Sequence, residues 1–322
     1  MKNVAVVCGG NSGEKVISLK SSQFVIDNLN PEKYQGYQVL IEGSEWNYIA
    51  PDGTEYPIDK NDFSVNTTGL RLKFDIVFNI IHGDPGENGK LQAYFEMLGI
   101  PNTSSDSTVS SLTFNKAYCN HIVRDLGVNV AASRHLFKHQ KIDEEAILNH
   151  VGIPCFVKPN SGGSSIGMSR VNAVEELLPA IEKAFAEDDE ILVEEFFEGR
   201  ELTCGVIQTH GEMVVFPICE VVSKKEFFDY EAKYSDDLVE ELIPAPIDNS
   251  VADVIKSTSV FLYKAIHLSG VARIDFIFNG DEYIFLEVNT IPGLSAQSIV
   301  PQMAREFGWT NTELLDRIIE EA

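Results

Sequence analysis

The sequence predicts an α/β domain built on a parallel sheet, followed by a larger region of α+β architecture. Strand-like and helix-like segments alternate through the first hundred residues, which is typical of a parallel sheet. The remainder is richer in strands. With 322 residues and 44% hydrophobic content, the chain is long enough for two or three domains with buried cores.

The N-terminal elements follow from the spacing of the apolar residues. Continuous apolar runs predict three buried strands, at residues 2–8, 37–42 and 74–81. Helical patterns cover residues 18–29 and 89–98, and Gly99 ends the second of these helices. The polar segment 100–107 then predicts a domain boundary.

The rest of the chain continues with helices, strands and two long loops. Predicted elements are a helix at 115–126, a strand at 155–158, a glycine-serine loop at 160–167, a helix at 173–185 and a strand at 191–195. A long polar loop at 223–240 and a final helix at 312–320 follow. We expect α+β architecture in this region.

Composition excludes several classes of partner. The net charge of -24 repels nucleic acid and anionic membranes, and no cluster of Lys and Arg offsets it. Five cysteines without metal-type spacing indicate free thiols in a reducing compartment. No signal peptide or membrane-spanning apolar run is present, so we expect a cytoplasmic protein.

Polar side chains interrupt two strongly apolar strands near the C-terminus. Arg273 and Asp275 share one face of the first strand, and Glu287 and Asn289 share one face of the second. Burying such groups costs several kcal/mol unless they are compensated. Two carboxylates and an amide oxygen suit Mg²⁺, so we expect a metal site on a hairpin; the alternative is a structural ion-pair network.

The hairpin interpretation requires a particular register. Asp275 and Glu287 point to the same side of an antiparallel pair only if facing residue numbers sum to an even number. A two-residue turn at Asn279 and Gly280 would make that sum odd. We therefore expect either a three-residue loop ending at Asp281 or a β-bulge.

Two glycine-rich segments and one histidine are further candidates for ligand contacts. The loop after Lys158 is rich in backbone and hydroxyl donors and could fold over phosphates, although a mobile surface linker is the alternative. Residues 9–14 follow the first strand, where Glu14 could pair with a substrate ammonium or with a helix dipole. His82 follows a buried strand at the end where α/β sheets bind ligands, but a hydrogen-bonded loop histidine is equally simple.

Residues 191–201 resemble an interdomain hinge. Its backbone could contact an adenine edge, with Glu201 on ribose hydroxyls; the alternative is an edge strand with a solvated acidic tip. The stretch 229–234 is too aromatic for a simple linker, and long loops of this kind are often functional lids.

Taken together, these motifs resemble the D-alanine:D-alanine ligase family of the ATP-grasp superfamily. The resemblance covers essentially the whole chain, and the order of eight motifs carries it. They are GGNSGE, HGDPGEN, FNK, KPNSGGSSIG, VEEFFEGRE, DYEAKY, RIDF and EVNTIPGLSAQSIVP.

The resemblance implies a three-domain ATP-grasp fold. Residues 1–101 would form an N-terminal substrate-binding α/β domain with a parallel sheet. Residues 102–193 would be a central subdomain with the glycine-serine lid loop, and residues 194–322 a C-terminal subdomain with the metal site and the long 223–240 loop. ATP would be clamped between the last two. A homodimer is expected.

The resemblance also implies roles for individual residues in nucleotide and metal binding. Lys116 and Lys158 would hold phosphates, and Lys233 would approach the γ-phosphate. Glu194 and Phe197 would border the adenine, and Glu201 would bind the ribose. Asp275, Glu287 and Asn289 would bind two Mg²⁺ ions, with Mn²⁺ as an alternative ion and Glu287 as the bridge.

The implied reaction joins two D-alanine molecules with ATP through an acyl phosphate. Glu14 would bind the first ammonium, while Ser164 and Tyr234 would join two loops over the site. Arg273 and the Gly293 N–H would stabilise the oxyanion, Ser298 would hold the second carboxylate, and His82 would lie near the reacting groups. The alternatives are another ATP-grasp carboxylate:amine ligase, such as a D-Ala-D-Ser or D-Ala-D-Lac enzyme, and a non-catalytic nucleotide-binding protein.

Overall fold

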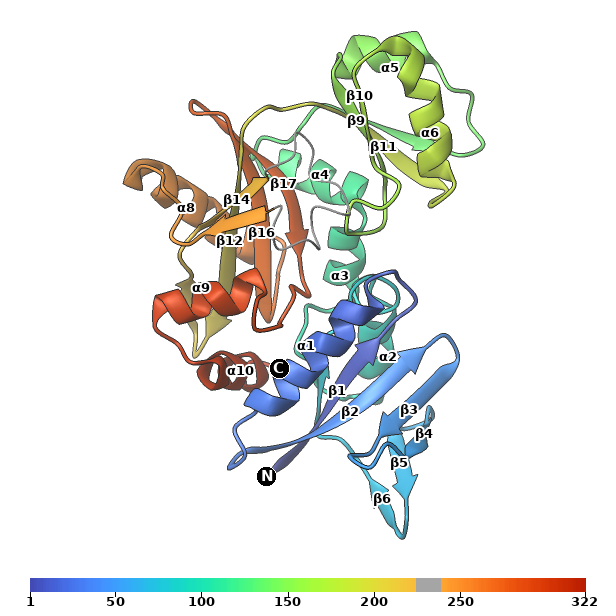
Figure 1. The fold of residues 1–322 in the computed structure, drawn as a ribbon, viewed down its shortest axis with the longest axis vertical. Coiled ribbons are helices and arrows are strands. Elements are labelled where there is room, and N and C mark those ends of the chain that lie inside the picture. The colour runs from blue at the N-terminus through green and yellow to red at the C-terminus, as the bar shows by residue number, and fades with distance from the viewer. Residues whose placement is uncertain (224–238) are drawn as a thin grey trace.

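The computed structural model describes residues 1–223 and 239–322, which form three lobes, each built on one sheet (Figure 1). The N-terminal lobe is blue in the figure, the central lobe is green to yellow-green, and the C-terminal lobe is olive to red. The helices are α1 (Lys15–Asn28), α2 (Lys90–Leu98), α3 (Ser107–Phe114), α4 (Lys116–Asp125), α5 (Glu144–Val151), α6 (Leu177–Phe185), α8 (Asn249–Ala265), α9 (Ile299–Phe307) and α10 (Asn311–Glu320), with a 3-10 turn η1 (Val174–Glu176).

The N-terminal sheet is mixed rather than wholly parallel. β1 pairs in parallel with β2 and β7, as the alternating pattern predicts, but β3 to β6 extend the sheet with antiparallel strands that the pattern did not reveal. Short connections of this kind permit only antiparallel pairing. The strands are β1 (Lys2–Gly9), β2 (Tyr34–Glu42), β3 (Glu45–Ile49), β4 (Glu55–Asp59), β5 (Ser64–Thr67), β6 (Leu70–Leu72) and β7 (Ile76–Asn79).

Element boundaries in this lobe agree with the predictions except at two places. The strand predicted at 74–81 is only β7, since the chain leaves the sheet after Asn79. The helix predicted from residue 18 begins one turn earlier, at Lys15. Gly99 ends α2 with a left-handed φ of 66°, as expected for a glycine at a helix end.

The central sheet separates an apolar face from a polar one. Its strands are β8 (Ser133–Phe137), β9 (Cys155–Pro159), β10 (Ser169–Val171) and β11 (Glu190–Glu195), in the order β10-β9-β11-β8. Helices α5 and α6 cover one face, where Val157 and Val193 are buried in an apolar core. Because side chains alternate along a strand, Lys158 and Glu194 lie on the opposite face. β11 ends at Glu195, beyond the boundary expected at residue 193.

The C-terminal sheet carries the hairpin predicted from the sequence. Its strands are β12 (Arg200–Thr209), β13 (Glu212–Val215), β14 (Cys219–Ser223), β15 (Val239–Leu242), β16 (Val271–Phe278) and β17 (Tyr283–Asn289). β16 and β17 pair antiparallel across a four-residue loop, 279–282, so the three-residue loop is wrong. A β-bulge between Asp275 and Phe276 restores the register, so Asp275 faces Glu287 and the predicted bulge is confirmed. Glu240, expected in the long loop, lies in β15.

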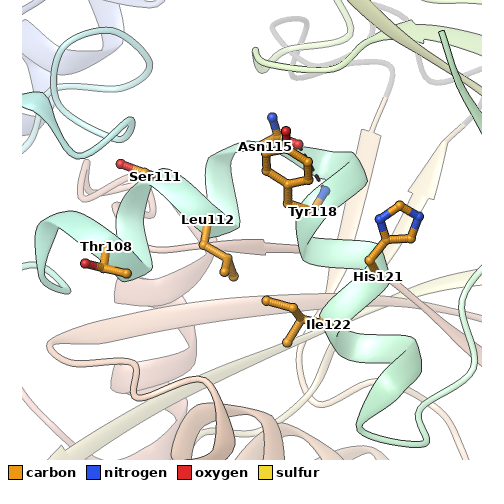
Figure 2. Close-up of a pocket in the computed structure, with 7 residues that line it drawn as sticks. All are labelled: Thr108, Ser111, Leu112, Asn115, Tyr118, His121 and Ile122. Atoms are coloured by element: carbon orange, nitrogen blue, oxygen red, sulfur yellow. Dashed lines mark hydrogen bonds between the residues drawn. The ribbon is translucent and has the colours of Figure 1, made fainter.

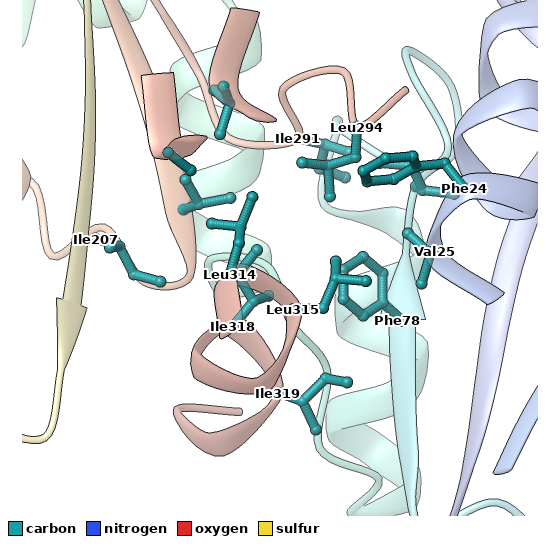
Figure 3. Packing of buried hydrophobic residues seen from close by; sticks show 14 of the residues in the cluster. Phe24, Val25, Phe78, Ile207, Ile291, Leu294, Leu314, Leu315, Ile318 and Ile319 are labelled. Atoms are coloured by element: carbon teal, nitrogen blue, oxygen red, sulfur yellow. The ribbon is translucent and has the colours of Figure 1, made fainter. Parts of the chain in front are cut away.

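Helix α10 joins the first lobe to the third. Figure 3 shows Leu314, Leu315 and Ile318 of α10 between Phe78 on one side and Ile207 on the other. These side chains belong to one buried apolar cluster that contains residues of both lobes. Lys33 adds two ion pairs to α10 at its edge, with Asp316 at 2.8 Å and Glu320 at 2.9 Å.

Cysteine chemistry and membrane insertion leave no mark on the described fold. All five cysteines are free and buried, as the odd count without metal spacing predicts. Within residues 1–223 and 239–322, no helix is both long enough and apolar enough to cross a membrane.

Candidate functional site

The hairpin brings a compact polar cluster to one face of the C-terminal sheet. Arg273 donates two hydrogen bonds to Asp275, from Nε to Oδ1 at 3.0 Å and from Nη2 to Oδ2 at 2.9 Å. Asn289 donates from Nδ2 to Oδ2 at 3.0 Å, and the Thr203 hydroxyl donates to Oδ1. The Asp275 side chain is only 3% exposed, so these donors compensate a buried charge.

The electrostatic environment keeps Arg273 charged. Burial alone would lower the pKa of Arg273, but the adjacent Asp275 carboxylate and the nearby Glu287 raise that pKa above its ordinary value. A guanidinium in a confined polar site is a fixed positive charge that can stabilise a developing negative one.

The predicted metal ligands are brought together by the register. Asp275 faces Glu287 across the two strands, and Asn289 faces Arg273. Two carboxylates and an amide oxygen are the hard oxygen donors that Mg²⁺ prefers, so the residues fit this ion. No group of three or more His, Cys, Asp and Glu side chains in the described residues is arranged to hold a metal, and this set contains only two carboxylates.

Lys116 connects the hairpin to the glycine-serine loop. It lies at the first position of α4, and its Nζ donates to the Gly162 carbonyl at 2.6 Å and lies 3.8 Å from Glu287 Oε2. The Asn160 side chain accepts from the Ala117 N–H at 2.9 Å, so the loop also caps the start of α4. The loop, the helix and the hairpin therefore meet at Lys116.

A buried ion pair lies on the polar face of the central sheet. Lys158 Nζ is 2.5 Å from Glu194 Oε2, and Asn120 Nδ2 donates to Glu194 Oε1 at 2.9 Å. Phe197 follows the end of β11, and Glu201 lies on β12, two positions before Thr203 and on the same face as the hairpin cluster.

Glu14 connects the N-terminal lobe to the glycine-serine loop. Its Oε1 accepts a hydrogen bond from the Ser164 hydroxyl at 2.5 Å, although the two residues are 150 positions apart. Ser164 has a positive φ of 55°, a strained conformation for a residue with a side chain. A Cβ on Gly163 would lie 2.9 Å from Glu14 Oε2, so the backbone approaches this carboxylate closely.

His82 and Glu87 lie beside this contact, in the loop between β7 and α2. Burial lowers the pKa of His82, although Glu14 and a backbone hydrogen bond at Ile291 act in the opposite direction. Burial raises the pKa of Glu87 to about 8, with Glu14 and Glu287 adding repulsion, and Glu87 Oε2 accepts from the Gly83 N–H at 2.7 Å. His82 is therefore neutral, and Glu87 holds a proton around pH 7.

The loop before α9 places two further predicted residues next to each other. Ser298 is the N-cap of α9, and its Oγ accepts from the Ser295 N–H at 2.9 Å. A Cβ on Gly293 would lie 2.9 Å from that same Oγ. The N-terminal end of a helix carries a partial positive charge, which favours a carboxylate. Lys233 and Tyr234 lie outside the described residues.

Family comparisons cover nearly the whole chain. The model for the D-ala D-ala ligase N-terminus matches residues 3–105, and the model for the D-ala D-ala ligase C-terminus matches residues 122–320. A D-alanine–D-alanine ligase from Parabacteroides distasonis is 44% identical over 321 residues, covering 99% of this chain and 97% of that protein. The chain belongs to the D-alanine–D-alanine ligase family.

Solved structures of this ligase family have the same ATP-grasp fold. D-alanyl-alanine synthetase A from Vibrio cholerae superposes with a TM-score of 0.88 at 26% identity, covering 99% of this chain and 97% of that one. The Bacillus anthracis ligase complexed with ATP gives 0.80 at 27% identity, covering 100% and 97%. The VanG D-Ala:D-Ser ligase from Enterococcus faecalis gives 0.86 at 33% identity, covering 99% and 98%.

Sequence reasoning missed four polar residues that contact the predicted site of this ligase family member. Each had a local signal. Thr203 alternates with Glu201 on one strand, and Glu87 belongs to the same motif as His82. Asn120 is one helical turn from Lys116, and Asn160 is the first residue of the glycine-serine loop.

An open apolar groove on α3 and α4 is separate from this cluster. Figure 2 shows Leu112 and Ile122 pointing into the space between the helices, with Tyr118 and His121 along α4. None of the residues predicted for the site lines this groove, so the site is defined by the polar contacts described above.

Proposed function

We propose that the protein joins two D-alanine molecules into D-alanyl-D-alanine, using ATP and releasing ADP and phosphate, for peptidoglycan precursor synthesis. One observation carries the proposal. Lys116 lies within reach of both the glycine-serine loop and Glu287, while Ser164 of that loop contacts Glu14. Residues suited to phosphate, metal and ammonium thus belong to one continuous site.

The first step would make the substrate carboxylate reactive. An amine cannot displace oxide from a carboxylate at useful rates, so a better leaving group is needed. ATP would transfer its γ-phosphoryl group to a carboxylate oxygen of the first D-alanine, forming an acyl phosphate and ADP. Lys116 and Lys158 would hold the phosphates, Glu194 and Phe197 would border the adenine, and Glu201 would bind the ribose.

Glu14 would orient the first D-alanine by pairing with its ammonium group. The Ser164 hydrogen bond holds the Glu14 carboxylate in the direction of the glycine-serine loop. Asp275, Glu287 and Asn289 would hold two Mg²⁺ ions, whose charge lowers the electrostatic cost of bringing a polyanion to a carboxylate.

The second step would form the peptide bond. The neutral amine of the second D-alanine attacks the acyl carbon, and its carboxylate would bind Ser298 at the start of α9. The tetrahedral oxyanion would lie between Arg273 and the Gly293 N–H, and its collapse expels phosphate. His82, kept neutral by burial, would lie near the reacting groups without adding positive charge.

Closure of the loops would protect the acyl phosphate from water. The contact between Glu14 and Ser164 joins two lobes over the proposed site, and a Tyr234 hydroxyl would complete this connection from the long loop. Lys233 would reach the γ-phosphate from that same loop.

The identity of the second substrate is the finer part of the proposal. A tyrosine at position 234 favours D-alanine, whereas the VanG relative is a D-Ala:D-Ser ligase. The decisive assay supplies MgATP with D-alanine alone, then with D-serine or D-lactate added, and measures ADP and product. We expect ADP and dipeptide from D-alanine alone; their absence would refute the proposal.

Further parts of the proposal concern the state of the protein in the cell. We place it in the cytoplasm, where ATP and free thiols are compatible with its chemistry, and as a homodimer that light scattering can test. The domain limits at residues 101 and 193 separate the three sheets, apart from the end of β11.

A further inference from the structure

Asn120 occupies a position in the nucleotide half of the site that the proposed chemistry does not use. It is only 4% exposed, and its amide donates to Glu194 Oε1 at 2.9 Å. Asn120 lies one turn after Lys116 on α4, so both side chains share one helix face. This face points toward the central sheet, whereas His121 is exposed on another.

Glu194 has two partners, and they differ in chemistry. Its Oε2 pairs with Lys158 Nζ at 2.5 Å, and its Oε1 accepts from Asn120. Glu194 is 5% exposed and Lys158 is 8% exposed, so both charges are removed from water. No other described side chain donates to Glu194, because the neighbouring His135 and Asn160 contact Glu190 instead.

The arrival of a phosphate would disturb this pairing. Lys158 can bind a phosphate oxygen only by directing part of its charge away from Glu194. A buried carboxylate that loses its cation is strongly destabilised unless another donor remains. The Asn120 amide is neutral and has no competing interaction with phosphate, so it can stay on Oε1 throughout.

We propose that Asn120 is a positioning residue for the nucleotide. It holds Glu194 in place while Lys158 exchanges its contact with Oε2 for a phosphate oxygen. This inference rests on the proposed function, because it requires ATP to bind on this face of the central sheet. It assigns Asn120 to ATP affinity and leaves the D-alanine subsites unaffected.

Direct nucleotide binding tests the inference without turnover. Isothermal titration with ATP, and separately with ADP, compares the wild-type protein with Asn120→Ala. Loss of one hydrogen bond to a buried charge predicts an increase in Kd for ATP of about tenfold. In steady-state assays the KM for ATP should rise by a similar factor, while the KM values for D-alanine stay at wild-type levels.

Three further variants separate this mechanism from a general structural effect. Asn120→Asp keeps the size of the side chain but replaces the donor with a negative charge beside Glu194, so its Kd should rise more. Glu194→Ala removes the group that Asn120 holds, so adding Asn120→Ala to it should weaken ATP binding no further. His121→Ala, at an exposed position of α4, is the matched control and should bind ATP normally.

The outcomes are distinguishable. Wild-type affinity in both Asn120 variants would overturn the inference, and so would equal losses for ATP and D-alanine together with a lower unfolding temperature. An additive loss in the double variant would also overturn it, since Asn120 would then act independently of Glu194. A wild-type protein that binds no ATP would instead refute the proposed function.

Discussion

Substitution of Gly163 by alanine probes the contact between the glycine-serine loop and the N-terminal lobe. The new Cβ would lie 2.9 Å from Glu14 Oε2 and 3.3 Å from Oε1, closer than such atoms normally approach. No positive φ is recorded for Gly163, so the backbone accepts alanine without strain. The flexible Glu14 carboxylate is therefore expected to swing away and break its bond to Ser164.

The expected magnitude follows from this one hydrogen bond. A hydrogen bond to a charged acceptor contributes about 1.5–3 kcal/mol, and each 1.4 kcal/mol is roughly tenfold in affinity. Because Glu14 is only partly buried, the lower end applies. We expect the KM for the first D-alanine to rise roughly tenfold, with the unfolding temperature almost unchanged.

The assay measures ADP release while D-alanine is varied at saturating MgATP, and separately while ATP is varied. The KM for ATP should stay at the wild-type value, since no nucleotide contact changes. Ser161→Ala is the control, because this exposed loop residue uses its backbone N–H, not its hydroxyl, to contact Asp188. An unchanged D-alanine KM in Gly163→Ala would refute the role of the Glu14–Ser164 contact in substrate binding.

Two other predictions concern carboxylates of the same site. Glu287→Gln should lower turnover by roughly 10³-fold with little effect on thermal unfolding, because it weakens a proposed bridging ligand; near-normal turnover would show that the metal site is misplaced. Glu87→Gln tests the raised pKa of about 8 in metal-free protein. The unfolded carboxyl releases its proton near pH 4.5, whereas the folded one keeps it until about pH 8. Wild-type stability should therefore fall with rising pH through this window, by at most about 1.4 kcal/mol per pH unit, relative to the Gln variant in urea unfolding. Parallel curves for the two proteins would contradict the raised pKa.

Local patterns predicted much of the site because side-chain direction is a local property. Alternation along the strands places Arg273 with Asp275 and Glu287 with Asn289, and the parity argument required a bulge or an odd loop. The same reasoning did not find β3 to β6, whose short segments lack a distinctive period.

The contacts between lobes required the tertiary structure. Neither the bond between Ser164 and Glu14 nor the one between Asn120 and Glu194 can be read from spacing, because 150 and 74 positions separate the partners. Such contacts depend on how the lobes dock, and docking is decided by the apolar cluster that α10 shares with both outer lobes.

The sequence alone therefore determined which residues share a strand face, the order of the motifs and the family they resemble. Only the tertiary structure decided that a four-residue loop with a bulge sets the register of the hairpin, and that α4 directs Lys116 and Asn120 into one site. The physical reason is that periodicity acts over a few residues, whereas register and docking result from packing and hydrogen bonding across the whole chain.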